Sequence, residues 1–368
     1  MQSRPLTIIT TRLPPQICGV GTFSWLLDRH WPGQTSGHRF LVVDDQNGAR
    51  TGESSRDIRG FGGDWSLLKR ALEEAGTTDV LLHYAGRAYQ PLGCPRGLAR
   101  VLGGWKLKSP TSRLAIFFHE LPARLPLFNR HRWINFCSRK VAGKLANIAD
   151  LIITNTVDHL KTLQDLAGDK DIRLVPVPSN IEPTASPSSP RARTEFAVFG
   201  LPYGRWRILE EFDVEIRSWL AKNLLTRLHL IGPTDQKFDI RSQELIQSYP
   251  NPNVVVRHGE LPPDRISELL STVQFGLTTV DESTWSKSGT LMAFLVHRCS
   301  VVSKTGSTVE PLVWNVRPEE IEQIGVDELH QRTDAARKWY DTNAGWEVVA
   351  RKISDWIAAA DTHCQLRT

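Results

Sequence analysis

The chain has 368 residues, of which 40% are hydrophobic and 23% are charged, and its formal net charge is +5. At roughly 100–200 residues per domain this length predicts two domains, and the composition is typical of a globular protein with buried cores. No stretch approaches the ~20 uninterrupted apolar residues of a transmembrane helix, and the apolar run near the N-terminus does not lead into the cleavage site of a signal peptide. These features predict a soluble protein without a transmembrane helix.

The first half of the sequence alternates strand-like and helix-like segments. Helices are predicted after the Gly-rich turn before Phe23, from an Asp64 N-cap through Ala75, and over Val157–Leu166. The strands are predicted by apolar runs at Leu6–Thr10, Arg39–Asp44, Asp79–His83, Arg113–His119 and Ala149–Asn155. Such strands, alternating with amphipathic helices, predict a parallel sheet covered on both faces.

The second half repeats this pattern after a segment rich in Pro and Ser, which predicts an exposed linker. Helices are predicted at Ile216–Leu225, Asp264–Leu270 and Thr290–Val296. The strands are predicted at Glu195–Phe199, Arg227–Ile231, Asn253–Arg257, Gln274–Thr279 and Ser300–Ser303.

These patterns predict an α/β protein with two doubly wound, Rossmann-like domains facing across a cleft. We place the N-terminal domain at 1–178, the linker at 179–194, the C-terminal domain at 195–340 and a final helix at 341–368. The helical tail carries an apolar stripe formed by Trp339, Trp346, Val349, Ile353, Trp356 and Ile357. Ligands of open α/β sheets bind beyond the carboxyl ends of the strands, so the candidate residues are sought there.

The first candidate is the turn that carries Gly19 and Gly21 between the first strand and the first helix. Glycines let backbone amides approach a ligand closely, and a helix N-terminus favours an anion. The third glycine of a dinucleotide fingerprint is replaced by Ser24. A sugar-phosphate or other anion fits best, while a nicotinamide cofactor and a purely structural turn remain alternatives.

The second candidate is His119, at the carboxyl end of an apolar strand. An imidazole placed there can hydrogen-bond a sugar hydroxyl or the reacting centre. The alternative is a histidine that caps the following loop.

The third candidate is the pair Arg205 and Arg207, expected in a loop after the strand that ends at Gly200. Two guanidinium groups can neutralise a diphosphate leaving group, on which charge grows in the transition state. The alternative is a pair of surface arginines.

The fourth candidate follows the strand Gln274–Thr279, where Lys287, Ser288, Gly289 and Thr290 open an apolar helix. Helix-terminal amides beside a lysine make a phosphate site, although the frame of a Walker A loop is absent. Glu282, in the preceding loop, can accept hydrogen bonds from sugar hydroxyls. The alternative is a plain Ser288 N-cap with Lys287 in solvent.

The chain resembles the GT-B glycosyltransferases, and within them the retaining, family-4-like group. The N-terminal loop motif of that group is matched by Pro15, Gly19, Val20, Gly21 and Phe23, and its histidine after an N-domain strand by His119. Its Ala-Asp strand motif is matched by Ala149–Thr156. In its donor motif, Glu282 takes the place of the first glutamate, and Thr290–Ala293 and Ser300–Val302 follow in order.

The resemblance implies a hexosyltransferase that retains the anomeric configuration and uses a nucleotide-sugar, UDP- or GDP-linked, as co-substrate without a further cofactor. It implies that the N-domain binds the acceptor and the C-domain the donor. His119 and Glu282 would contact the donor sugar, and Gly19 and Gly21 would close over phosphate and sugar. The residues expected to hold the nucleotide and its phosphates are Arg205, Arg207, Lys287, Ser288, Gly289 and Thr290.

Two departures from the family motif leave two other functions open. Thr290 stands in place of the second glutamate, and Leu201 in place of the arginine that follows the strand-end glycine. A nucleotide-sugar epimerase on the same fold and a non-catalytic partner subunit are therefore the alternatives. Because cationic side chains can hold a diphosphate, we expect no metal.

Charge and cysteines bear on partners and compartment. Residues 1–178 have a Lys and Arg excess, and 130–144 interleave basic residues with Trp133 and Phe136. This predicts an anionic acceptor (glycan, lipid-linked or small-molecule) or a peripheral contact with the inner membrane face, and no nucleic-acid motif is found. The scattered cysteines predict free thiols and a reducing cytoplasm, with no zinc site: Cys18, Cys94, Cys137, Cys299 and Cys364.

Overall fold

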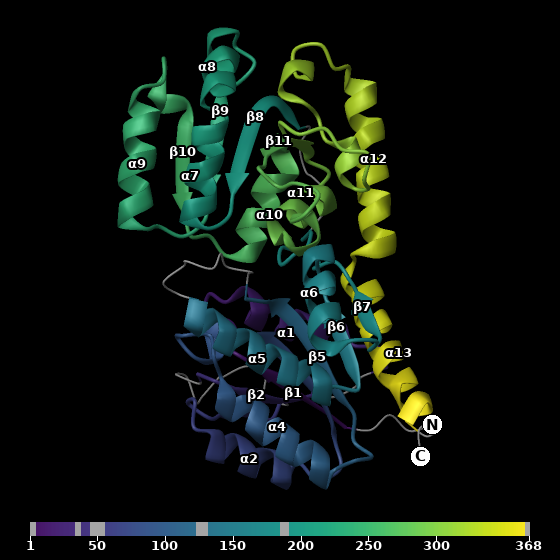
Figure 1. Ribbon diagram of the computed structural model, residues 1–368. Helices are drawn as coiled ribbons and strands as arrows, with labels where there is room; N and C mark the ends of the chain where they lie inside the picture. Colours follow the sequence, from purple (N-terminus) through teal and green to yellow (C-terminus); the bar gives the residue numbers. More distant parts are fainter. Residues whose placement is uncertain (1–4, 34–37, 45–55, 123–131, 185–190, 365–368) are drawn as a thin grey trace. The chain divides into compact units, whose positions relative to one another are not determined.

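The computed structural model describes residues 5–33, 38–44, 56–122, 132–184 and 191–364. The chain divides into two compact units (Figure 1): unit 1 comprises Met1–Pro176 and Trp346–Thr368, and unit 2 comprises Val177–Gly345. Arg130, His131 and residues 185–190 of the predicted linker lie outside the described residues.

Unit 1 contains a parallel sheet of seven strands in the order β3-β2-β1-β4-β5-β6-β7. The strands are β1 (Leu6–Thr10), β2 (Arg39–Val42), β3 (Ile58–Gly60), β4 (Asp79–Ala85), β5 (Leu114–Glu120), β6 (Leu151–Thr154) and β7 (Ile172–Leu174). In β1, Ile8 lies opposite Phe40 on one side and Leu81 on the other. The central strands are buried on both faces, which explains their continuous apolar runs.

Helices cover both faces of this sheet, as predicted. The helices are α1 (Gly19–Arg29), α2 (Trp65–Glu74), α3 (Gly86–Tyr89), α4 (Arg96–Lys108), α5 (Arg132–Ile148), α6 (Val157–Ala167) and α13 (Trp346–Cys364). Along one face α2, α4, α5 and α6 pack side by side (Figure 1), burying Leu68, Leu98 and Leu145. Asp64 caps α2 by accepting a hydrogen bond from the amide of Ser66.

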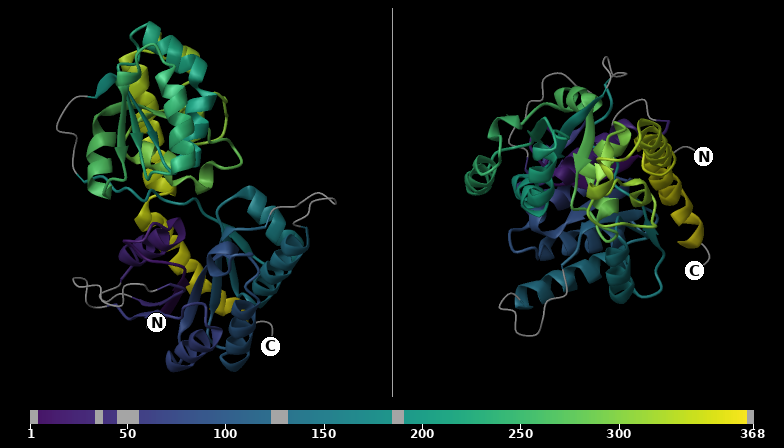
Figure 2. Two further views of the ribbon diagram at one scale, coloured as in Figure 1. Left: turned by 90° about the vertical axis from the view of Figure 1, so that its left-hand side faces the viewer. Right: turned by 90° about the horizontal axis from the view of Figure 1, so that it is seen from above.

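The C-terminal helix α13 packs against α1 on the opposite face of the unit 1 sheet (Figure 2). Its first residue, Trp346, is 3% exposed, and its ring lies 5.2 Å from that of Phe23. The return of the last helix to the N-terminal unit is thereby confirmed. The predicted stripe is shared between two helices, however, because the chain leaves helical geometry at Ala344 and Trp339 packs on Trp285 in unit 2.

Unit 2 contains a parallel sheet of five strands in the order β10-β9-β8-β11-β12. The strands are β8 (Ala192–Phe199), β9 (Arg227–Ile231), β10 (Val255–Gly259), β11 (Val273–Leu277) and β12 (Ser300–Val302). One face is covered by α7 (Pro202–Glu211), α8 (Asp213–Ala221) and α9 (Gln236–Gln247), and the other by α10 (Pro263–Thr272), α11 (Gly289–Val296) and α12 (Val326–Asn343). Both units are thus doubly wound, as predicted.

The start of the expected linker is not an exposed segment. Ser179 and Ile181 are buried in unit 2, and β8 begins at Ala192. The Ser179 amide donates to the hydroxyl of Tyr340, and the Ser179 hydroxyl bonds the backbone of Ile181. Composition predicts exposure here, but these bonds satisfy the polar groups and allow Ile181 to join the core.

Across the stretches of chain that the structure describes, every helix is too short or too polar to cross a bilayer.

Trp346→Ala should destabilise unit 1 by about 3–5 kcal/mol, the usual cost of removing a buried Trp side chain. The measurement is urea unfolding followed by circular dichroism. The matched control is Trp133→Ala, because Trp133 is 80% exposed and its removal leaves no cavity. Equal midpoints for the two variants would contradict the docking of α13 through Trp346.

Candidate functional site

Two glycines mark the carboxyl ends of β8 and β9 in unit 2. Gly200 and Gly232 have φ values of 137° and 135°, which side chains rarely adopt. A Cβ atom on Gly232 would overlap the carbonyl oxygen of Gly200 and the guanidinium group of Arg205. A Cβ atom on Gly200 would lie 3.3 Å from the Thr290 hydroxyl. Glycine at both strand ends therefore lets β8, β9 and α11 converge.

Arg205 holds these two strand ends together. Its side chain is buried, with Nη1 donating to the carbonyl oxygen of Gly200 at 2.8 Å and Nη2 to that of Pro233 at 2.7 Å. Burial lowers the pKa of this guanidinium group, with a smaller contribution of the same sign from Arg257. Asp239 acts in the opposite direction.

Arg205 and Arg207 lie on a helix, whereas the sequence predicted a loop. Both belong to α7, which begins with Pro202 at a position favourable for proline. Residues two positions apart on a helix do not face each other, and Arg207 lies 3.7 Å from Glu211 at the surface. The two guanidinium groups are therefore not brought together.

The start of α11 presents open backbone amides. The Ser288 hydroxyl accepts a hydrogen bond from the amide of Leu291 at 3.1 Å, which is ordinary N-capping. For the amides of Gly289 and Thr290, no hydrogen-bond acceptor is found in the described parts of the chain. Lys287 ends a short 3-10 helix, Trp285–Lys287, and is exposed beside this terminus. A helix N-terminus with an adjacent cation can bind an anion.

Glu282 lies in the exposed turn between β11 and α11. Its carboxylate accepts a hydrogen bond from the Ser307 hydroxyl at 2.7 Å. The neighbouring Asp281 organises the turn, because hydrogen bonds from Ser283 and Thr284 hold its pKa below the usual range. The turn thus fixes its own backbone and leaves Glu282 at the surface.

Sequence reasoning did not single out two residues of this region. Gly232 was visible only as a strand-end glycine, and its close approach to Gly200 depends on the pairing of β8 with β9. Asn180 lies near Gly289, and its buried side-chain oxygen has no hydrogen-bond partner among the described residues. No sequence signal indicated Asn180, because it belongs to the predicted linker.

In unit 1 the Gly19–Gly21 segment is the first turn of α1 and not a loop before the helix. Gly21 is required by packing, since a Cβ atom there would overlap the carbonyl oxygen of Arg12. Gly19 has open space around it. The Cys18 side chain does not cap the helix, and the amides of residues 19–21 find no acceptor in the part of the chain that is described. This terminus can also accept an anion.

His119 lies in a buried aromatic cluster at the end of β5. Its Nε2 is 3.0 Å from Nδ1 of His83, and its ring stacks on Phe117 at 4.1 Å. Burial lowers the pKa of His83 to about 3, and burial with the nearby His83 lowers the pKa of His119 well below its ordinary value. Both imidazoles are therefore neutral at pH 7, and the N–H group of one donates a hydrogen bond to the ring nitrogen of the other.

Among the residues that the structure describes, no group of three or more His, Cys, Asp and Glu side chains could hold a metal ion. Cys18, Cys94, Cys137 and Cys299 are free thiols.

Comparison with known proteins identifies the fold. No protein-family model matches the sequence, and no curated protein matches it. A sucrose-phosphate synthase from Thermosynechococcus elongatus is similar in structure, with a TM-score of 0.66 at 13% identity over 95% of this chain and 98% of that chain. An alpha,alpha-trehalose 6-phosphate synthase from Burkholderia multivorans gives 0.68 at 10% identity over 100% and 99%.

A third match is HepE from Anabaena, solved in complex with UDP and glucose, with a TM-score of 0.63 at 14% identity over 95% of this chain and 99% of that chain. The chain has the GT-B fold of glycosyltransferases. In this GT-B chain the candidate residues Gly289 and Thr290 lie at a helix N-terminus beside a strand-end glycine of unit 2.

Gly232→Ala should destabilise unit 2 by about 2–4 kcal/mol, because alanine at this positive φ is strained and its methyl group overlaps Gly200 and Arg205. Gly204→Ala is the matched control. It lies within α7 with open space around it, so alanine should be neutral or stabilise by up to ~1 kcal/mol. Unfolding by urea measures both, and equal effects would contradict the packing of the two strand ends.

The buried histidines predict that stability falls in acid. In the unfolded chain His83 has a pKa near ~6.5, whereas in the folded chain its pKa is about 3. Its contribution is therefore complete above about pH 6.5 and is lost progressively as the pH falls towards 3, by up to ~1.4 kcal/mol per pH unit. His83→Phe should make the slope of unfolding free energy between pH 6 and 4.5 shallower.

The control for this slope is His330→Phe, because His330 is exposed on α12. Urea unfolding at several pH values supplies the data. A slope that is equally steep in His83→Phe and in the wild type would show that His83 does not titrate as described.

Proposed function

We propose that this protein is a hexosyltransferase that moves a sugar from a nucleotide-diphosphate sugar to an acceptor, with retention of the anomeric configuration. The observation that carries the proposal is the approach of Gly200, at the carboxyl end of β8, to Thr290 at the open N-terminus of α11, which the exposed Lys287 precedes. Ligands of open α/β sheets bind at such ends. The GT-B fold and the similar HepE, solved with UDP and glucose, support it.

The diphosphate would bind the start of α11. The open amides of Gly289 and Thr290 point along the helix axis, where the helix dipole favours negative charge. Lys287 would add a full positive charge to neutralise the leaving group, on which charge grows during transfer. Because the Ser288 hydroxyl already caps the helix, we assign Ser288 a structural role at this terminus and not a contact with phosphate.

Arg205 receives a positioning role in this proposal. Its buried guanidinium group fixes the Gly200 and Pro233 carbonyl groups, which sets the shape of both strand ends, and it adds positive charge near the phosphates. Arg207 is engaged with Glu211 on another face of α7. We therefore propose that Lys287, rather than Arg205 or Arg207, contacts the phosphates.

The donor sugar is assigned to Glu282, whose exposed carboxylate can exchange its Ser307 hydrogen bond for a sugar hydroxyl. Retention needs no side-chain base in line with the acceptor hydroxyl, and no such base is assigned. Contacts of Gly19, Gly21 and His119 with phosphate or sugar remain predictions for unit 1. The basic excess of the first half of the chain favours an anionic acceptor.

A second candidate is a GT-B partner subunit that binds a nucleotide-sugar without turning it over. It is favoured by Thr290 in the place of a glutamate and by Leu201, which is 63% exposed where the family resemblance implies an arginine. Donor binding without release of the nucleoside diphosphate, in the presence of mixed acceptors, would support it.

The donor site predicts a thermal shift with nucleotides. A ligand at 100 times its Kd stabilises the folded state by about 2.7 kcal/mol, so millimolar UDP, GDP or their sugars should raise the melting temperature by several degrees. Lys287→Ala should weaken binding at least tenfold, since it removes a charge-assisted contact with phosphate.

The matched control is Lys338→Ala, because Lys338 is exposed on α12 of the same unit. Differential scanning fluorimetry over a nucleotide titration provides the dissociation constants. The proposal fails if no nucleotide shifts the wild-type transition, or if Lys287→Ala and Lys338→Ala bind alike.

A further inference from the structure

We propose that the outer face of α5 in unit 1 binds the surface of an anionic lipid bilayer. This α5 face consists of Trp133, Phe136, Lys140 and Lys144, which recur at three- and four-residue spacing and therefore share one side of the helix. The inference is independent of the donor site, because it concerns helices that cover a face of the sheet and not the ends of strands.

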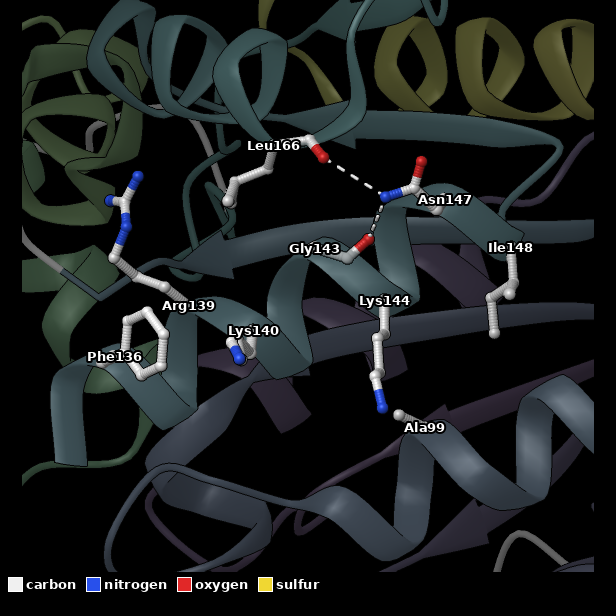
Figure 3. A pocket seen from close by; sticks show the side chains of 9 residues that line it. All are labelled: Ala99, Phe136, Arg139, Lys140, Gly143, Lys144, Asn147, Ile148 and Leu166. Atoms are coloured by element: carbon white, nitrogen blue, oxygen red, sulfur yellow. Dashed lines mark hydrogen bonds between the residues drawn. The ribbon is translucent and has the colours of Figure 1, made fainter. Parts of the chain in front are cut away.

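The α5 face borders a hollow of about 690 Å³ (Figure 3). Ala99 of α4 and Leu166 of α6 contribute to its lining on either side of α5. Gly143 has no side chain to fill this hollow, and a Cβ atom on it would contact Leu166 at 3.6 Å. The lining is mostly apolar, and the ammonium groups of Lys140 and Lys144 lie beside it. An apolar hollow with cationic sides fits an amphiphile with a negative head group.

Large apolar side chains are exposed at the start of the α5 face. Trp133 is 80% exposed, and its neighbours Ile134 and Phe136 are also exposed. Burying such side chains is favourable by about 25 cal/mol per Å² of apolar area, and Trp is enriched at membrane–water interfaces. Trp133 and Phe136, which lie on the α5 face, are therefore placed to enter the boundary between head groups and acyl chains.

The chain segment that contains α5 is rich in positive charge, whereas the neighbouring α6 exposes Asp158 and Asp165. Residues 80–149 contain twelve Lys and Arg but a single acidic residue, Glu120. Lys106 and Lys108 of α4 are paired with Asp150 and Glu73. Lys140 and Lys144, by contrast, have no carboxylate partner within the described ranges, and Lys140 lies 4.6 Å over the Phe136 ring.

Arg139 adds a further cation beside the α5 face and contributes to the lining of the hollow. Its Nη1 atom is buried and has no hydrogen-bond partner among the described residues. Because this atom is not accessible from the surface, any contact of Arg139 with a head group would involve the exposed part of its guanidinium group. Cationic groups near an anionic leaflet are attracted by its surface potential, so charge and apolar surface act in the same direction.

A bilayer explains this combination better than a nucleic acid does. The backbone of a double-stranded nucleic acid is bound by cations and polar groups, and it would leave the exposed side chains of Trp133 and Phe136 in water. An interfacial helix with Lys and Arg beside Trp and Phe buries both kinds of group at the lipid surface. The occupant is therefore the phosphate-bearing surface of a membrane, which the helix contacts without crossing.

Vesicle co-sedimentation of the full chain tests the proposal. The protein should bind vesicles of phosphatidylglycerol and phosphatidylcholine and not vesicles of phosphatidylcholine alone. Lys140→Glu with Lys144→Glu should lower partitioning at least tenfold, and Trp133→Ala with Phe136→Ala should also lower it severalfold. Lys140→Arg with Lys144→Arg should retain it.

The matched control is Lys69→Glu with Arg70→Glu on α2, which makes the same change in net charge on exposed residues of unit 1. Circular dichroism confirms that each variant is folded. Equal loss in this control, unchanged binding in the α5 charge variant, or unchanged binding in the aromatic variant would each overturn the proposal. Binding to double-stranded DNA that depends on Lys140 and Lys144, without vesicle binding, would also overturn it.

Discussion

A parallel sheet must bury both faces, and this constraint governs both units of the protein. Each crossover between strands places a helix on one face, so α2, α4, α5 and α6 on one side and α1 and α13 on the other close the unit 1 sheet. Because helices occupy the two faces, ligand binding is left to the edges of the sheet and the ends of its strands. In unit 2 the carboxyl ends carry Gly200 and Gly232, and α11 starts beside them. The constraint that builds the core therefore also locates the candidate site.

The polar groups at the strand ends differ between the two units in their burial and hydrogen bonding. In unit 1 the His83–His119 pair is buried among Phe23, Phe117 and Trp346, and burial keeps both imidazoles neutral. In unit 2 the charge of Arg205 is kept but bonded to backbone carbonyl groups, while the amides of α11 stay open. Anion binding is therefore better supported at unit 2, where positive charge and free donors lie at the surface.

The proposed lipid-binding face and the proposed transferase activity are connected through the acceptor. A nucleotide-sugar is soluble, whereas a lipid-linked glycan acceptor stays in the membrane. A chain whose acceptor-side unit carries cations and exposed Trp133 on α5 would hold itself where such an acceptor is found. The two proposals remain separable, because the α5 face and the α11 terminus lie in different units and share no residue.

Much of the fold could be read from local patterns. Strands such as Leu6–Thr10 and Arg227–Ile231 were predicted to the residue, because continuous apolar runs between polar turns leave few other assignments. The cap at Asp64 and the start of α11 near Thr290 follow from residue types that favour helix N-termini. Order and spacing of motifs also sufficed to predict the GT-B fold.

Tertiary structure decided what depends on neighbours distant in sequence. The sequence by itself predicted most strands of the two sheets, several of their helices and the residues Lys287 to Thr290 at a helix start, whereas α7 was expected to be a loop. It did not reveal that Arg205 is bound to two carbonyl groups, that Gly232 abuts Gly200, or that His119 pairs with His83, because each contact joins separate elements. Composition also wrongly predicted that Ile181 is exposed, because its burial depends on hydrogen bonds between its backbone and the Ser179 hydroxyl. Local pattern sets which elements form, and only packing sets which polar groups remain free to bind a ligand.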